Sequence, residues 1–183
     1  MQVLKSAETR MDKAIESLKR ELSVLRTGRA SAALLDNIKV DYYGMPTPIN
    51  QMAQITIPEP RQLVVKAYDK STMSDIERAI NEANIGLTPN SDGDVIRLNI
   101  PSLTEERRRE LAKKVKVFAE DAKVAIRNVR RDANDELKKM QKNGDITEDD
   151  LKGYNEDVQK LTDKKIKEVD QVASDKETDI MSI

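Results

Sequence analysis

Apolar residues recur every three or four positions along three long stretches of the chain, with charged residues between them. This spacing predicts amphipathic α-helices, each with one apolar face. Three such helices can bury their faces against one another as a bundle. The three stripes are Leu4, Ala7, Met11, Ile15, Leu18, Leu22 and Leu25; Leu111, Val115, Phe118, Ala122, Ile126, Val129, Ala133, Leu137 and Met140; and Leu151, Tyr154, Val158, Leu161, Ile166, Val169, Val172 and Ile180.

The starts and stops of these helices also leave marks in the sequence. Gly28 stands at a plausible C-cap of the first helix. The second helix has two possible starts, Ser102 with Glu105 three residues on, or Thr104 with acidic residues in the first turn. The pattern does not choose between these starts.

The second helix is predicted to run from about residue 104 to residue 142, where Asn143-Gly144 ends it. Thr147, with Asp150 three residues later, can cap the third helix. Roughly 38 residues at about 1.5 Å each make the second helix about 57 Å long. A helix of that length predicts an elongated rod.

Residues 30–102 have a different pattern. "IKVDYYG", "QITIP", "QLVVKAY" and "VIRLNIP" are short and β-branched and predict strands. "YYGMPTP" and "TPNSDGD" are rich in turn residues, and "SDIERAINEANIG" predicts a helix that stops at Gly86. These features predict a small β/α/β domain inserted between the first two long helices.

The expected fold is therefore α+β: an elongated antiparallel three-helix bundle formed by residues 1–29 and 103–183, carrying a small domain at residues 30–102. Both connections meet at one end of the rod, which predicts a hinge. Glycine adds backbone freedom to one connection and proline restrains the other. The predicted hinge residues are Gly28, Arg29, Ala30, Ser31, Pro101, Ser102 and Leu103.

Composition argues against an enzyme. The chain has no Cys and no His, so the usual nucleophile–base pairs and the commonest metal ligands are missing. Its six glycines are scattered, and none builds a phosphate-binding loop. We therefore expect no catalytic residue, metal or cofactor. The absence of Cys and of any long apolar run fits a cytoplasmic protein that does not contact membranes.

Charge is distributed unevenly along a chain whose totals are nearly equal, with 32 basic and 33 acidic side chains. Residues 104–131 hold 10 basic and 5 acidic side chains, whereas residues 132–183 hold 9 basic and 15 acidic ones. Such asymmetry is typical of a surface that binds a polyanion.

Within this basic region, "AIRNVRRDANDEL" gathers three arginines on one helix. Measured from Val129, Arg127, Arg131 and Asn134 should point away from the buried stripe, with Arg130 at its flank. One interpretation is a solvated face with ion pairs at four-residue spacing. The details favour another: Lys123, Arg127 and Arg131 form a row of like charge, and Lys123 and Arg127 lack acidic partners at that spacing. A row of this kind suits the phosphates and 2′-hydroxyls of folded RNA.

Several segments, in order, resemble the bacterial ribosome recycling factor family. They are "LRTGRAS", "VDYYGMPTP", "LTEERRREL", "IRNVRRDAND" and "DVQKLTDK", and the resemblance covers essentially the whole chain. It implies a three-helix bundle with a hinged β/α/β domain, in an L shape that approximates transfer RNA.

The resemblance also implies a function. Members of this family enter the ribosome after peptide release and split the post-termination complex together with elongation factor G and GTP. It implies that Arg127 and Arg130, joined by Arg26 from the first helix, contact ribosomal RNA of the large subunit. A monomer is expected. The alternative hypothesis is a coiled-coil scaffold or chaperone whose apolar stripes bind protein.

Overall fold

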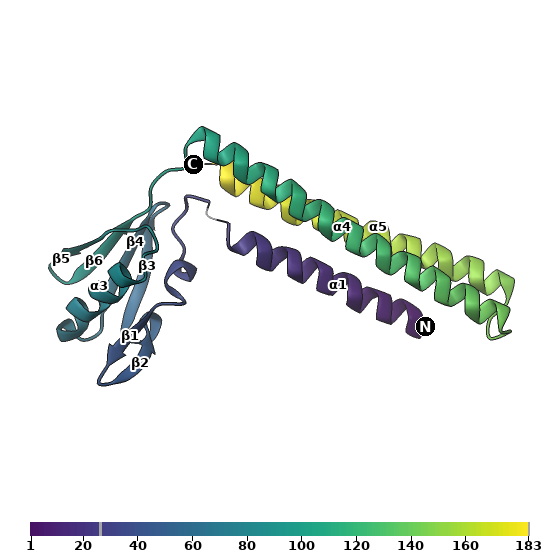
Figure 1. Ribbon diagram of the computed structural model, residues 1–183, viewed down its shortest axis with the longest axis horizontal. Coiled ribbons are helices and arrows are strands. Elements are labelled where there is room, and N and C mark those ends of the chain that lie inside the picture. Colours follow the sequence, from purple (N-terminus) through teal and green to yellow (C-terminus); the bar gives the residue numbers. More distant parts are fainter. Residues whose placement is uncertain (26, 183) are drawn as a thin grey trace. The chain divides into compact units, whose positions relative to one another are not determined.

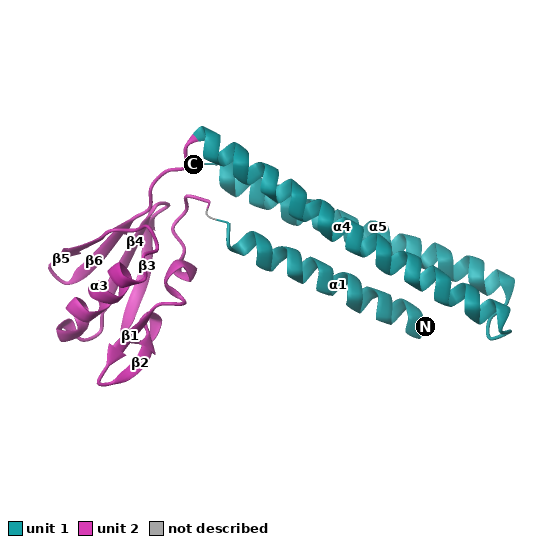
Figure 2. Cartoon of the chain, in the orientation of Figure 1, with its two compact units in different colours: residues 1–26, 105–182 teal, residues 27–104, 183 magenta. Residues whose placement is uncertain are grey.

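The computed structural model describes residues 1–25 and 27–182, which form two compact units (Figure 2). Residues 1–26 and 105–182 make up the helical unit, and residues 27–104 make up the inserted unit. Long helices in one unit and a small sheet in the other confirm the α+β prediction. The unit boundaries lie near, but not at, the predicted ones at residues 29 and 103.

The helical unit consists of α1 (Gln2–Ser23), α4 (Glu105–Lys142) and α5 (Glu148–Met181). Helices α1 and α5 run in the opposite direction to α4, as Figure 1 shows. Each helix contributes one buried stripe to a shared apolar core, which is the packing expected of a bundle. The buried apolar residues are Val3, Ala7, Met11, Ile15, Leu18 and Leu22 of α1; Leu111, Val115, Ala119, Ala122, Ile126, Val129, Ala133 and Leu137 of α4; and Val158, Val169 and Ile180 of α5.

The turn between α4 and α5 follows the sequence signals. Gly144 has φ +81°, and its N–H and that of Asp145 donate to the carbonyls of Gln141 and Met140. These paired bonds form a Schellman motif, which satisfies carbonyls at the end of α4. Thr147 then caps α5 through a reciprocal capping box with Asp150. The predicted end of one helix and start of the next are both confirmed.

The end of α1 differs from the prediction. The helix stops at Ser23, and a short i→i+3 bond from Leu25 N–H to the carbonyl of Leu22 tightens the chain there. Gly28 has φ +77°, but it lies beyond the helix and is not its C-cap. Leu25 therefore lies outside the helix and is not part of its buried stripe. At the other end of α1, Val3 is buried rather than Leu4.

The inserted unit is built on an antiparallel sheet with the strand order β3-β4-β6-β5, in which β4 and β6 are central. Alternate residues of the central strands, Leu63, Val65, Ile96 and Leu98, are buried. Their core is completed by Ile76 and Ile80 of α3 and by a short hairpin, β1-β2. The strands are β1 (Lys39–Tyr42), β2 (Met45–Pro48), β3 (Ala53–Glu59), β4 (Gln62–Ala67), β5 (Pro89–Asp92) and β6 (Val95–Asn99), and the helices are α2 (Ile49–Met52) and α3 (Met73–Glu82).

Two segments expected to be turns form strands instead. In "YYGMPTP" only Tyr43-Gly44 turns, and Met45–Pro48 pairs with β1. In "TPNSDGD" Pro89–Asp92 forms β5, which pairs with β6. Both are edge strands, where prolines and polar residues are tolerated because one side of the strand makes no ladder bonds. Because turn-forming residues are so frequent in these segments, their composition did not predict that they pair as strands.

The core between α1 and α5 contains a lysine. Lys165 is 5% exposed, and its Nζ lies 2.6 Å from Asp12 Oδ1, 3.8 Å from Glu8 Oε1 and 3.7 Å from Glu168 Oε1. Burial opposes the charged ammonium, but the hydrogen bond to Asp12 and the surrounding carboxylates outweigh it and raise the pKa of Lys165. Thr162 is also buried, whereas the predicted core residues Leu161 and Ile166 are only half-buried.

Candidate nucleic-acid interface

The arginine stretch of α4 separates into a buried side and an outer side, as predicted. Ile126, Val129, Ala133 and Leu137 are buried in the bundle, and Arg131 is exposed. Arg127 keeps 38% of its side chain exposed. The outer side of this part of α4 is thus open to a partner.

Two cations of the predicted row have acidic partners, contrary to the expectation. Lys123 Nζ lies 2.5 Å from Asp170 Oδ1 on α5, and Arg127 Nη1 donates to Glu120 Oε1 at 3.2 Å on its own helix. The prediction from sequence considered only acidic residues four positions away on the same helix. It missed Glu120, which lies seven residues from Arg127, and it could not include a carboxylate from another helix. The row is therefore not free of acidic partners.

Arg130 and Arg131 differ from these two because their contacts are with amides. Arg130 Nη1 lies 3.5 Å from Gln159 Oε1 on α5, and Arg131 Nη1 lies 3.5 Å from Asn128 Oδ1. An amide oxygen carries no net charge, so it orients a guanidinium without neutralising it. The positive charge of the stretch is thus concentrated at Arg130 and Arg131.

Asn134 does not lie on the exposed face of α4, where the sequence pattern predicted it. It is half-buried, and its Oδ1 is buried without a hydrogen-bond partner among the described residues. Val129 stands at one edge of a stripe that includes Ala133 and Leu137, so angles measured from Val129 overstate how far Asn134 turns outward. Asn134 therefore lies at the flank of the stripe and not on the exposed face.

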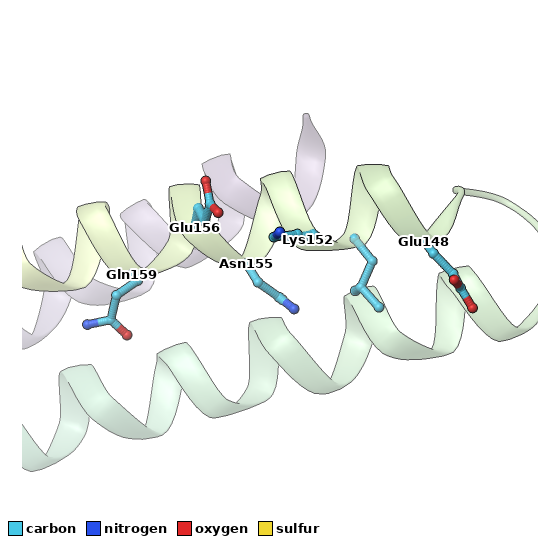
Figure 3. Close-up of a pocket in the computed structure, with 6 residues that line it drawn as sticks. Glu148, Lys152, Asn155, Glu156 and Gln159 are labelled. Atoms are coloured by element: carbon cyan, nitrogen blue, oxygen red, sulfur yellow. The ribbon is translucent and has the colours of Figure 1, made fainter.

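The flank beside Arg130 is bordered by a shallow groove along α5. The groove has a volume of about 410 Å³. Figure 3 shows Asn155 and Gln159 extending from α5 toward the neighbouring helix α4. The Oδ1 atom of Asn155, like that of Asn134, is buried without a partner among the described residues. The groove is lined by Glu148, Leu151, Lys152, Asn155, Glu156 and Gln159.

Two groups of predicted site residues lie away from α4. Arg26 lies outside the described residues. Of the predicted hinge residues, Ala30 donates its N–H to the carbonyl of Pro60 at 2.7 Å, and Ser31 accepts from the N–H of Ala33. Arg61 donates to Ser102 Oγ at 2.5 Å. All of these bonds lie within the inserted unit, so they hold Ala30, Ser31 and Ser102 to it.

The α5 residues that contact the cationic side chains were not found from sequence. Gln159 and Asp170 were not identified as site residues, because the register of α5 against α4 is needed to see what they face. The only local signal is the spacing of Gln159 and Asp163, which are four residues apart and hydrogen-bonded at 2.9 Å.

The part of the chain that the structure describes holds neither a candidate metal site nor a candidate membrane-spanning helix. No cluster of three or more acidic residues there could hold a metal ion. No described helix combines the length and apolar character needed to cross a bilayer.

Comparison with known proteins gives a consistent result. Residues 18–181 match the sequence model of the family described as ribosome recycling factor. The chain is 60% identical over 182 residues to a ribosome-recycling factor of Bacillus cytotoxicus, covering 100% of this chain and 98% of that protein. A ribosome-recycling factor of Listeria welshimeri is 58% identical with the same coverage.

Solved structures agree with the sequence relatives. The solution structure of a ribosome recycling factor matches with a TM-score of 0.76 and 44% identity, covering 100% of this chain and 97% of the other. The fold is thus that of a helical-bundle protein with a small inserted unit that combines an antiparallel sheet with a helix. The chain belongs to the ribosome recycling factor family.

A second solved structure contains a relative bound to a ribosomal complex. It is described as models for the Thermus thermophilus ribosome recycling factor and the Escherichia coli elongation factor G bound to the E. coli post-termination complex. The match has a TM-score of 0.65 and 44% identity, covering 98% of this chain and 97% of the other.

Proposed function

We propose that this protein is a non-catalytic translation factor that frees ribosomes from messenger RNA after termination, together with elongation factor G and GTP. Family membership supports the proposal, and so does the 44% identical relative described in a post-termination complex with elongation factor G. The energy for splitting the ribosome comes from the partner factor, while this chain supplies shape and contacts.

We further propose that α4 docks on ribosomal RNA of the large subunit. The observation that carries this proposal is the charge of Arg130 and Arg131, whose intramolecular contacts are with amide oxygens and leave both guanidinium groups cationic. Guanidinium groups match phosphate geometry with paired hydrogen bonds. Arg127 and Lys123 add to the surface but share their charge with Glu120 and Asp170.

Replacing Arg130 with alanine is expected to weaken binding to isolated large ribosomal subunits by about tenfold near physiological salt, because one phosphate contact is lost. The slope of log affinity against log salt should fall by about 1. Binding is measured by sedimentation or fluorescence anisotropy at several salt concentrations.

Arg78→Ala is the matched control, since Arg78 is an exposed arginine of α3 whose nearest carboxylate is 4.0 Å away. Equal affinity and equal salt slope for Arg130→Ala and the control would remove the RNA-docking role. Binding of the wild type to itself or to unfolded proteins, unaffected by Arg130→Ala, would favour the scaffold alternative.

We propose that the two connections between the units act as a hinge, which would let elongation factor G move the inserted unit. The bonds of Ala30, Ser31 and Ser102 lie within the inserted unit, so we propose that the bending occurs outside these three residues. Gly28, with φ +77°, adopts a backbone conformation that favours glycine. The L shape and the monomeric state stay predictions.

The hinge predicts more than one angle between the units in solution. Distance distributions between spin labels at Arg78 and Lys138, both exposed, should be broad for the free protein and narrow when it is bound to the ribosome. One narrow distribution, identical in the free and bound protein, would contradict the hinge.

A further inference from the structure

Gln159 occupies an unusual place on α5. It is an exposed polar residue, yet its side chain faces the neighbouring helix α4 (Figure 3), where its Oε1 lies 3.5 Å from Arg130 Nη1. Its Nε2 donates to Asp163 Oδ1 at 2.9 Å. Because the amide nitrogen is held by Asp163, the amide oxygen is the atom presented to Arg130.

We infer that Gln159 is a positioning residue for Arg130. The inference rests on the proposed RNA-docking function and names how α5 contributes to it. Gln159 and Asp163 form a relay in which the carboxylate orients the amide and the amide orients the guanidinium. The side chain of Arg130 is thereby directed before RNA arrives, which lowers the entropic cost of ordering it on binding.

The chemistry of the acceptor matters as much as its position. A carboxylate at this place would hold Arg130 more tightly but would also neutralise it and compete with phosphate. Lys123 illustrates that arrangement, since it is paired with Asp170 and keeps only 21% of its side chain exposed. Gln159 gives orientation while Arg130 keeps its charge, and Asp163 makes its hydrogen bond to Gln159 rather than to Arg130.

The substitution Gln159→Glu tests this inference because it changes the charge of the acceptor with almost no change in shape. We expect it to weaken binding to large subunits by about fivefold and to reduce the salt slope, since Arg130 becomes paired with a carboxylate. The helical unit should unfold at nearly the same temperature as in the wild type.

The chain offers a closely matched control on the same helix. Gln171 donates from Nε2 to Asp175 Oδ1 at 2.8 Å, four residues along, and both residues are exposed. Gln171→Glu therefore loses the same kind of hydrogen bond and gains the same repulsion from an aspartate at i+4. It changes no contact of Arg130 and should bind like the wild type.

A double-mutant cycle separates positioning from general repulsion of RNA by an added negative charge. If Gln159 acts through Arg130, adding Gln159→Glu to Arg130→Ala causes no further loss. A further fivefold loss in the Arg130→Ala background would overturn the inference. So would equal binding by Gln159→Glu and Gln171→Glu while Arg130→Ala is weakened.

The failure of the proposed function gives a different pattern. In that case Arg130→Ala itself binds like the wild type, and the inference falls with it. A measurement without ribosomes adds a separate test: rotation of the Arg130 guanidinium, followed by NMR of the free protein, should be slower in the wild type and Gln171→Glu than in Gln159→Met. Equal rotation in all three would also overturn the relay.

Discussion

Replacing Lys165 with alanine is expected to destabilise the helical unit by about 3 to 5 kcal/mol. Two effects add. Three buried methylene groups are lost, worth about 2 to 3 kcal/mol at 0.8 kcal/mol each. The hydrogen bond from the ammonium to Asp12 is lost as well, and bonds between charged groups contribute about 1.5 to 3 kcal/mol. Urea unfolding followed by circular dichroism measures the change.

Lys165→Met distinguishes the two effects because it keeps the apolar stem and removes the charge. Its cost should be below about 2 kcal/mol, since the lost hydrogen bond to Asp12 is partly offset by no longer burying an ammonium group. The partners Glu8, Asp12 and Glu168 are 49%, 51% and 43% exposed, so water can solvate them after the lysine is gone. Equal losses for the alanine and methionine variants would show that the charge, and not the packing of the stem, dominates.

The pH dependence follows from the raised pKa of Lys165. Folding favours its protonated form, so this stabilisation is fully present below its ordinary pKa of 10.5 and is lost as pH rises through the higher value in the folded state. The wild type should therefore lose more stability than Lys165→Met above pH 10.5. Parallel curves for the two proteins over that range would contradict an ionic role for Lys165.

Lys165 also shows where sequence patterns stop being informative. Val158, Thr162, Lys165 and Val169 have the spacing of a buried stripe, but two of the four are polar. Apolar periodicity alone therefore favoured Leu161 and Ile166. The carboxylates that pair with the buried Lys165 belong to another helix, since Glu8 and Asp12 lie on α1. They can be recognised as its partners only once α1 and α5 are placed side by side.

Two features that depend on groups only a few residues apart could be predicted from the sequence alone. The capping box of Thr147 and the end of α4 at Asn143-Gly144 depend on groups close together in the sequence, and both were predicted correctly. The partners of Lys123 and Arg130 come from α5 and depend on the register between helices. A periodicity argument could thus identify the cationic face but could not tell which of its charges are neutralised.

Leu63→Ala should destabilise the inserted unit by about 2 to 5 kcal/mol, because Leu63 is fully buried in the central strand β4 and a cavity replaces it. The inserted unit has its own core, whose buried residues all lie between Leu35 and Leu98. Typical domains are stable by only about 5 to 15 kcal/mol, so a small unit of this kind loses much of its stability. Hydrogen exchange, read segment by segment, measures each unit separately.

The two-unit architecture makes a specific forecast for this variant. Amides of β4 and β6 should exchange much faster, while those of α4 and α5 should keep their protection, because their cores are separate. Leu137→Ala, which removes an equally buried leucine from the helical unit, should give the reverse pattern. Loss of protection in α4 on Leu63→Ala would contradict independent cores.

If α4 carries the docking surface and the inserted unit responds to elongation factor G, Leu63→Ala should still bind large subunits and yet fail to recycle ribosomes. Binding and recycling would then be lost through different cores, a separation that a single cooperative core could not produce.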